Sequence, residues 1–395
     1  MTETAIRPTG KGTPFYRDER FLRILGQLVF LAVLTAILGY LLRNMLINLQ
    51  RQGLGLGFDF MQLTAGFDIG EHLIPYDRSH TYLQAFGVGL LNTVLVAVLG
   101  IILATILGMI FGIAGLAGNL LIRTIARAYI EFLRNIPLLV LLVFLYTGVF
   151  IQFPRIKEAI ILPGPIFITN RGVAIPWGLP TEGFQLYLAW LGVALALGIV
   201  SGVILKWYRT RKDRPGATWS LGFILFLVLA GAGWWLMPAL PLTLDTPAVK
   251  GLRLAGGKLL SPEFMALLFG LAIYTSAFIA DVVRAGIQSV SRGQVDAAKS
   301  LGLNSSQTLR LIVLPQALRV IIPPLTSQYL NLTKNSSLAV AIGYPELFHV
   351  SGTIINQSGR AVETITIVMA IYLSISLLTS AFMNWYNRRV RLVER

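Results

Sequence analysis

Long uncharged stretches of apolar residues alternate with shorter polar segments along this chain. A helix that crosses the hydrocarbon core of a membrane needs about 20 predominantly apolar residues. The stretches that come near this length cover residues 24–42, 83 to about 116, 135–153, 183–205, 217–236, 264–280, 320–343 and 364–387. The pattern therefore predicts an all-α integral membrane protein with about eight transmembrane helices.

Two of these stretches are irregular. The second exceeds a single crossing, and its surplus toward Ile122 predicts a short helix along the cytoplasmic surface. The seventh contains Pro323, Pro324 and Lys334 in an otherwise apolar run. Interruptions at membrane depth are tolerated only where the freed backbone groups face protein or a watery cavity. We therefore expect the seventh stretch to be broken and to lie beside a pathway through the membrane.

The composition excludes a soluble monomer. Hydrophobic residues make up 55% of the chain, charged residues make up 13%, and the mean hydropathy is +0.70. A typical soluble domain has about a quarter of its residues charged. Cysteine is absent, which excludes disulfides and thiolate metal sites.

The basic residues are unevenly distributed along a chain with a net charge of +15. If both termini are cytoplasmic, the segments on that side hold 21 of the 33 Lys and Arg residues, and the outer segments hold ten. The cytoplasmic segments are then 1–23, 117–127, 206–214, 284–319 and 385–395. Cytoplasmic loops of membrane proteins carry an excess of Lys and Arg. The charge therefore predicts cytoplasmic termini and requires no nucleic-acid partner.

The longest cytoplasmic segment, residues 284–319, has the pattern of a helical hairpin. Gly302 stands where a left-handed turn would end a first short amphipathic helix. Asn304 and Gln307 have the spacing of a capping box at the start of a second one. By pattern alone, such a hairpin could be a linker that rests on the membrane surface. DNA binding is disfavoured, because membrane spans tether both ends and few basic residues are clustered.

The same hairpin resembles the EAA motif of ABC-importer permeases. The residues at the motif's spacing are Asp296, Ala297, Ala298, Gly302, Ile312, Leu314 and Pro315, with Asp in place of the usual Glu. In that family the motif forms coupling helices that dock into a groove on the ATP-hydrolysing subunit. The resemblance implies that these residues couple the chain to such a subunit.

Other segments resemble permeases for polar amino acids. Residues 128–139, 284–289 and 334–338 match that subfamily, and the resemblance covers about 84–154 and 263–390. The chain departs from the family pattern at Leu141, where Gln is frequent, and at Asn335 and Ser336, where Asp and Thr are usual.

The resemblance also implies how the chain is divided. The expected parts are a cytoplasmic tail 1–23, an additional first span 24–48, a first core segment 84–154, an inserted two-span hairpin 183–236, and a second core segment 263–390 that includes the coupling loop 284–319. The core would then be the five-helix core of a type I ABC importer. The extra span and the inserted pair are similar to the Q-type subunit of the general L-amino-acid permeases.

The resemblance implies a permease subunit in the bacterial inner membrane. Such a subunit moves polar or general L-amino acids from the periplasm to the cytoplasm by alternating access, driven by ATP hydrolysis in a partner. The implied partners are an ATP-binding subunit dimer that holds ATP and Mg, a second permease chain that is related to this one, a periplasmic amino-acid-binding protein, the L-amino acid and membrane lipid.

We expect this chain to be no enzyme and to hold no cofactor or metal of its own. The phosphate-loop pattern G-x-x-x-x-G-K-[ST] does not occur in the sequence. The three histidines, His72, His80 and His349, lack the spacing of metal ligands.

The alternative function is a proton-coupled secondary amino-acid transporter. Such a protein would use membrane carboxylates as proton carriers, and the candidates are Glu131, Asp281 and Glu363. All three are expected near helix ends, where a charge costs little, so this alternative is disfavoured. A channel or a purely structural subunit would explain the helices but would leave the coupling motif unexplained.

Polar side chains within the core spans are candidates for substrate binding, because polar groups in lipid require partners. They are Tyr274, Thr275 and Ser276 on the sixth stretch, and Gln328, Asn331, Asn335, Ser336 and Ser337 on the seventh. Small polar residues also join membrane helices to one another, so packing is the competing interpretation. Arg134 and Lys334 could pair with a substrate carboxylate, although Glu131 is an alternative partner for Arg134.

Overall fold

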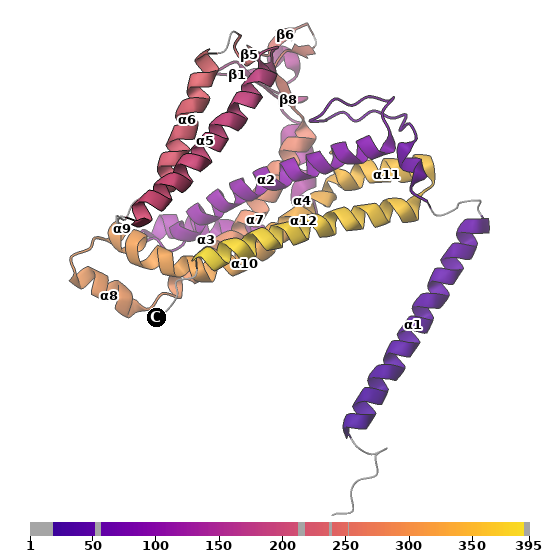
Figure 1. The fold of residues 1–395 in the computed structure, drawn as a ribbon, viewed down its shortest axis with the longest axis horizontal. Coiled ribbons are helices and arrows are strands. Elements are labelled where there is room, and N and C mark those ends of the chain that lie inside the picture. Colours follow the sequence, from indigo (N-terminus) through magenta and orange to yellow (C-terminus); the bar gives the residue numbers. More distant parts are fainter. Residues whose placement is uncertain (1–18, 52–56, 212–217, 237–238, 252, 391–395) are drawn as a thin grey trace, which may run out of the picture.

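The computed structural model describes residues 19–51, 57–211, 218–236, 239–251 and 253–390. Residues 1–18 of the expected tail and residues 212–217, which include part of the basic loop 206–214, lie outside the described residues. The described chain is largely helical (Figure 1). Its helices are α1 (Glu19–Arg51), α2 (Tyr82–Ala114), α3 (Leu120–Arg134), α4 (Leu138–Phe144), α5 (Phe184–Arg211), α6 (Thr218–Leu236), α7 (Pro262–Gln288), α8 (Arg292–Ser300), α9 (Ser305–Thr308), α10 (Leu314–Asn335), α11 (Leu347–Ser358) and α12 (Ala361–Val390).

The number of membrane spans agrees with the prediction. Within the described residues, 7 helices are long and apolar enough to cross a membrane, and α3 with the segment that follows it makes up to 8. The third predicted span was wrong in its extent. Its helix begins at Leu138, continues as a π-helical turn over Leu145–Phe150, and is bent by 103° from α3. Pro137 lacks a backbone N–H and precedes the new helix, which accounts for the break.

The seventh stretch is broken as predicted, and the break follows Lys334 instead of the two prolines. α10 continues through Pro323 and Pro324 and changes to a 3-10 turn over Ser336–Ala341. The surplus of the second stretch is a separate amphipathic helix, α3, as expected from the interruption after Ala114.

α2 and α7 form the centre of the helical body. In the most apolar part of α7, 67% of the residues are buried, against 28% in α2. The two backbones approach closely at Gly108 and Gly112. A Cβ atom at Gly112 would lie 2.8 Å from the Ala280 carbonyl oxygen, and one at Gly108 would lie 2.5 Å from Ile279. These glycines permit a contact between the helices that a larger residue would prevent.

Short strands flank the inserted pair α5–α6, and the sequence did not predict them. β1 (Ile160–Leu162), β2 (Ile166–Thr169), β3 (Gly172–Ile175) and β8 (Lys258–Leu260) form an antiparallel sheet in the order β1-β2-β3-β8. β4 (Trp177–Pro180) pairs with β5 (Leu242–Asp245), and β6 (Ala248–Lys250) pairs with β7 (Arg253–Ala255). We call the end of the helices with these strands the strand end, and the end with α8 and α9 the hairpin end (Figure 1).

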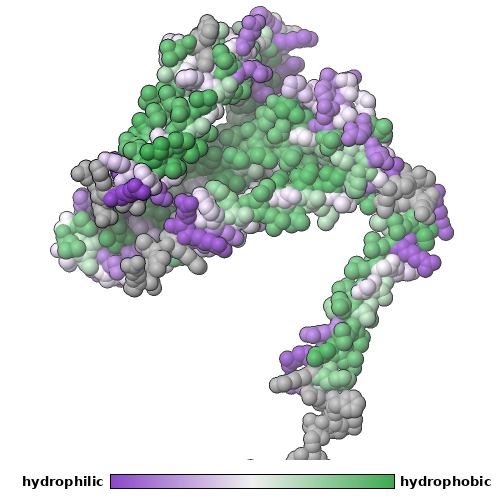
Figure 2. All heavy atoms as spheres, in the orientation of Figure 1, coloured by the Kyte–Doolittle hydropathy of each residue, from purple (hydrophilic) through white to green (hydrophobic). Residues whose placement is uncertain are grey.

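Apolar surface covers much of the molecule. Figure 2 shows hydrophobic residues over the helical body, the α5–α6 pair and α1. α1 stands apart from the helical body in Figure 1, and none of the residues in its most apolar stretch is buried. Side chains such as Phe30 (68% exposed) and Leu378 of α12 (71% exposed) require lipid or another subunit around them.

Candidate functional site

The hairpin between α7 and α10 has the predicted turn. Gly302 has a φ of +80°, in the left-handed region that favours glycine, and its N–H donates to the Lys299 carbonyl. The Asn304 side chain accepts from the Gln307 N–H at 2.8 Å, and the Gln307 side chain accepts from the Asn304 N–H at 3.0 Å. The predicted capping box is therefore present.

The second arm of the hairpin differs from the prediction. It is no separate helix, because α9 passes through a π-helical turn, Leu309–Val313, directly into α10. The change in helix type precedes Pro315, whose ring cannot fit against the carbonyl four residues earlier in a regular helix. The hairpin is thus joined rigidly to a membrane span, so a force on it would be passed along α10.

The motif residues differ in their exposure to solvent. Ala298 is buried, and Ile312 and Leu314 are half-buried. Asp296, Ala297, Gly302 and Pro315 are exposed, and Leu301 beside the turn is 82% exposed. An apolar side chain at the tip of a polar hairpin is suited to insertion into another protein.

An ion-pair network joins α3 to the root of the hairpin. Arg134 Nη1 lies 2.9 Å from Asp281 Oδ2, and Arg284 Nη2 lies 2.8 Å from Asp281 Oδ1. Arg134 therefore pairs with Asp281 and not with the alternative partner Glu131. α3 packs against α7, and the Arg134 side chain lies over the Phe278 ring at 5.6 Å, which directs the guanidinium to α7.

The substrate candidates on α7 lie at a helix contact. Ser276 is fully buried, its hydroxyl oxygen is 2.7 Å from the Tyr129 hydroxyl of α3, and it donates to the Ile273 carbonyl. Thr275 is 3% exposed, and Tyr274 is half-buried against a hydrophobic cluster of Leu133, Leu141 and Ala277. These contacts favour the packing interpretation for this group.

The substrate candidates on α10 and the following 3-10 turn differ in burial and in their position relative to a groove. Ser336 is fully buried and donates to the Thr333 carbonyl. Gln328 and Asn335 are half-buried, and Asn331 is exposed. Of the candidates, Ser337 lines a groove of about 460 Å³, together with Lys334. The remainder of the groove consists of Phe348, Val368, Met369, Tyr372, Leu373 and Ser376.

A buried polar cluster at the start of α11 was missed by the sequence analysis. Glu346 is fully buried, caps α11, and accepts hydrogen bonds from the N–H groups of Phe348 (2.9 Å) and His349 (2.8 Å). The Tyr372 hydroxyl of α12 donates to Glu346 Oε2 at 2.9 Å, the oxygen that also accepts from Phe348. Thr93 of α2 accepts from the Leu347 N–H at 3.0 Å. The cluster fixes α11 to α2 and α12, and the isolated acid in an apolar segment was the signal that could have revealed it.

Comparison with known proteins identifies the architecture. Residues 104–392 match the family described as "Binding-protein-dependent transport system inner membrane component". The chain belongs to this family. The match begins inside α2 and includes the α5–α6 pair, the hairpin and α12. The predicted permease subunit is confirmed, as are its non-catalytic role and its multi-pass location in the inner membrane.

Three relatives extend the match to almost the whole chain. The General L-amino acid transport system permease protein AapQ of Rhizobium johnstonii is 42% identical over 404 residues, with 100% of both chains covered. The putative amino-acid ABC transporter permease protein YhdX of Escherichia coli is 43% identical, covering 98% of this chain and 99% of the relative. The glutamate/glutamine/aspartate/asparagine transport system permease protein BztB of Rhodobacter capsulatus is 40% identical over 96% of each. The predicted resemblance to the Q-type permeases is thus confirmed.

Proposed function

We propose that this chain is the permease subunit of an ATP-binding-cassette importer that moves polar or general L-amino acids from the periplasm to the cytoplasm. The observation that carries the proposal is the exposed hairpin of α8 and α9, which has a left-handed turn at Gly302 and a continuous connection into α10. The names of the three relatives supply the substrate class.

The hairpin end is cytoplasmic in this proposal, and so are both termini. The excess of Lys and Arg in the segments on that side supports the orientation. An ATP-binding subunit dimer, with its ATP and Mg, receives the hairpin through Leu301 and the exposed motif residues. A related second permease chain covers part of the exposed apolar surface, and a periplasmic amino-acid-binding protein meets the strand end.

The groove beside α10 and α12 is the proposed substrate contact within the membrane. Lys334 offers a positive charge to the α-carboxylate, and Ser337 offers a hydroxyl. The α7 group of Tyr274, Thr275 and Ser276 is assigned to helix packing. Gln328, Asn331, Asn335 and Ser336 position the groove from α10 and its 3-10 turn.

Two of the three carboxylates named for the proton-coupled alternative form ion pairs with arginine. Asp281 pairs with Arg134 and Arg284, and Glu363 Oε1 lies 3.2 Å from Arg360 Nη1. These ion pairs give both carboxylates a structural partner within the permease itself.

Reconstitution tests the proposal. Proteoliposomes with the complete complex and the binding protein are expected to take up L-amino acids only with ATP on the ATPase side. Uptake without ATP under a proton gradient would contradict it and favour the secondary transporter.

A further inference from the structure

A cavity of about 450 Å³ lies at the strand end. Three separate segments form its walls: residues 67–71 before α2, residues 259–263 at the start of α7, and residues 343–353 around α11. Its volume falls within the range of small-molecule sites, which is about 300–1,000 Å³. None of its lining residues is among the substrate candidates of the membrane spans.

The cavity is lined by hydrogen-bond acceptors that have no partner among the described residues. Glu71 Oε1 and His349 Nδ1 are both buried atoms without a hydrogen bond. Asp68 and Glu263 also line the cavity, whereas its described lining contains no Lys or Arg. Asp68 lies 4.0 Å from Arg78, and Glu263 accepts from the Tyr146 hydroxyl at 2.8 Å. Glu71 contacts Ser261, but its Oε1 is a buried carboxylate oxygen of the lining without a hydrogen bond.

Burial disfavours the charged form of both Glu71 and His349. Burial raises the pKa of the Glu71 carboxyl, since contacts with Ser261 and the charge of Lys258 compensate only in part. A bound cation would relieve the cost of that buried charge. Burial lowers the pKa of His349, so its imidazole is neutral near pH 7 and can accept at Nδ1.

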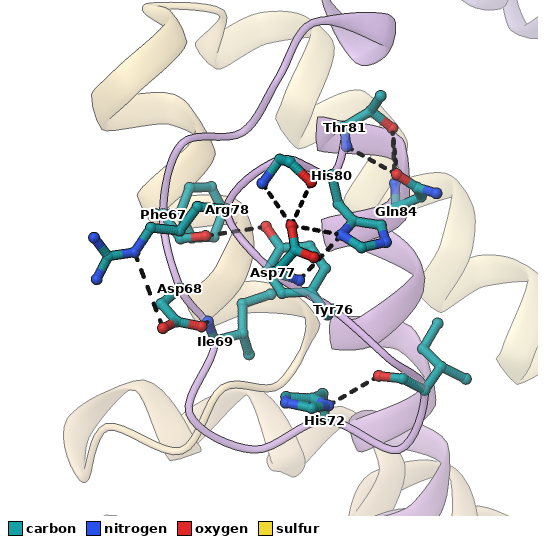
Figure 3. A network of polar contacts seen from close by, with 12 residues as sticks. Phe67, Asp68, Ile69, His72, Tyr76, Asp77, Arg78, His80, Thr81 and Gln84 are labelled. Carbon is teal, nitrogen blue, oxygen red and sulfur yellow. Dashed lines mark hydrogen bonds and ion pairs between the residues drawn. The ribbon is translucent and has the colours of Figure 1, made fainter.

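The walls are held in place by polar contacts. The Asn92 side chain of α2 donates to the carbonyls of both Glu71 and Pro345, each at 2.8 Å, and so joins two walls. Figure 3 shows the loop before α2, where the Tyr76 hydroxyl donates to the Phe67 carbonyl and Arg78 reaches Asp68. The Glu71 backbone is thus fixed before any ligand arrives, which lowers the entropic cost of binding.

One helix separates this cavity from the membrane groove. His349, Val350 and Thr353 of α11 line the cavity, and Phe348 of the same helix lines the groove with Lys334. A molecule in the cavity is therefore one helix away from the groove.

We propose that this cavity binds the α-ammonium group of an amino acid at the strand end, before the amino acid reaches the membrane groove. Glu71 Oε1 and His349 Nδ1 accept two of the three ammonium hydrogens. The inference rests on the proposed function, and it adds an outer binding site to it. All L-amino acids share this group, so the site holds substrates without selecting among side chains.

The test uses the complete complex in proteoliposomes with the binding protein and a neutral L-amino acid. Glu71→Gln keeps the shape and removes the charge, and Asp59→Asn is the matched control, because Asp59 is an exposed acid of the same loop outside the cavity. We expect about tenfold lower uptake in E71Q, because one charge-assisted hydrogen bond is lost. Uptake by D59N should equal that of the wild type. ATPase stimulation by the binding protein should be unchanged in D59N, and the concentration of binding protein that gives half-maximal stimulation is measured for both variants.

Equal uptake by the E71Q and wild-type complexes would overturn the proposal. If E71Q instead needs more binding protein for half-maximal ATPase stimulation, the cavity takes an ammonium group of that protein and not of the amino acid. Failure of the wild-type complex to import any amino acid would refute the proposed function instead.

A second variant guards against misassembly of E71Q. Thr353→Phe fills the cavity from α11 without changing a charge, and it is expected to lower uptake by about tenfold as well. Normal uptake by an assembled T353F complex would show that the cavity is not on the route.

Discussion

Arg134, the last residue of α3, forms an ion pair with Asp281 of α7 at 2.9 Å. Asp281 also holds Arg284, close to the root of the hairpin. The pair thus ties the amphipathic helix to the span that leads into the hairpin.

Removal of the Arg134 side chain should destabilise the permease slightly. Half-exposed ion pairs contribute about 0–1 kcal/mol, and the contact with Phe278 adds about 0.5–1 kcal/mol. We expect Arg134→Ala to lower the unfolding temperature of the purified complex by about 2–4 °C. Glu131→Gln, which alters the exposed acid three residues earlier, should leave that temperature unchanged. A larger decrease in E131Q than in R134A would indicate that Arg134 pairs with Glu131 of α3 instead of Asp281.

Gly302→Val should separate ATP hydrolysis from transport. A β-branched residue at a φ of +80° costs about 1–3 kcal/mol and would reshape the tip of the hairpin. ATPase activity and uptake, measured in the same proteoliposomes, should diverge, with uptake reduced more strongly. Gly293→Ala, in the helical part of α8 with nothing within 4 Å, is the matched control and should behave as wild type. Full-rate import by G302V would refute the role of the hairpin.

The close contact between α2 and α7 makes Gly112 sensitive to substitution. A Cβ atom there would lie 2.8 Å from the Ala280 carbonyl and 2.9 Å from the Val283 side chain. Overpacking of this kind typically costs about 1–3 kcal/mol. Gly112→Ala is therefore expected to lower the unfolding temperature, whereas Gly87→Ala, earlier on α2 with nothing within 4 Å, should not. Equal stability of the two variants would show that α2 can shift away from α7.

The Tyr372 hydroxyl should be required for a stable α11. Tyr372→Phe leaves the fully buried Glu346 carboxylate without one of its donors, which costs about 1–3 kcal/mol. The expected result is a lower unfolding temperature and faster proteolysis around α11. Tyr386→Phe, at a 41% exposed position of the same helix, is the control. An unchanged Y372F complex would indicate that another group satisfies Glu346.

Local chemistry allowed the sequence to predict the spans, the turn at Gly302 and the Asn304 capping box. Each of these depends on residues within a few positions of one another, such as a length of apolar helix or a left-handed glycine. The strands β1 to β8 have three or four residues each, too few for a periodic pattern to be recognised.

The contacts that were missed are long-range. Arg134 and Asp281 are 147 positions apart, and the partner of Glu346 lies 26 positions away on another helix. A sequence indicates which polar residues need partners, but the packing of α3 on α7 selects the partner. The same applies to the substrate candidates, because only the fold separates Ser276 in a helix contact from Ser337 in a groove.

Substitution of Lys334 should weaken transport of all amino acids to the same degree. Its side chain lines the groove beside Ser337, where it can pair with the α-carboxylate that every substrate carries. We would measure uptake of an acidic, a neutral and a basic amino acid by Lys334→Gln, Ser337→Ala and Asn335→Ala complexes with intact basal ATPase activity. The expected result for K334Q is a roughly tenfold rise in half-saturation for all three, with a smaller uniform change for S337A. Ser276→Ala, at the contact of α7 with α3, should alter stability and leave half-saturation unchanged. If K334Q lost only the acidic substrate, Lys334 would bind a side chain and not the shared carboxylate.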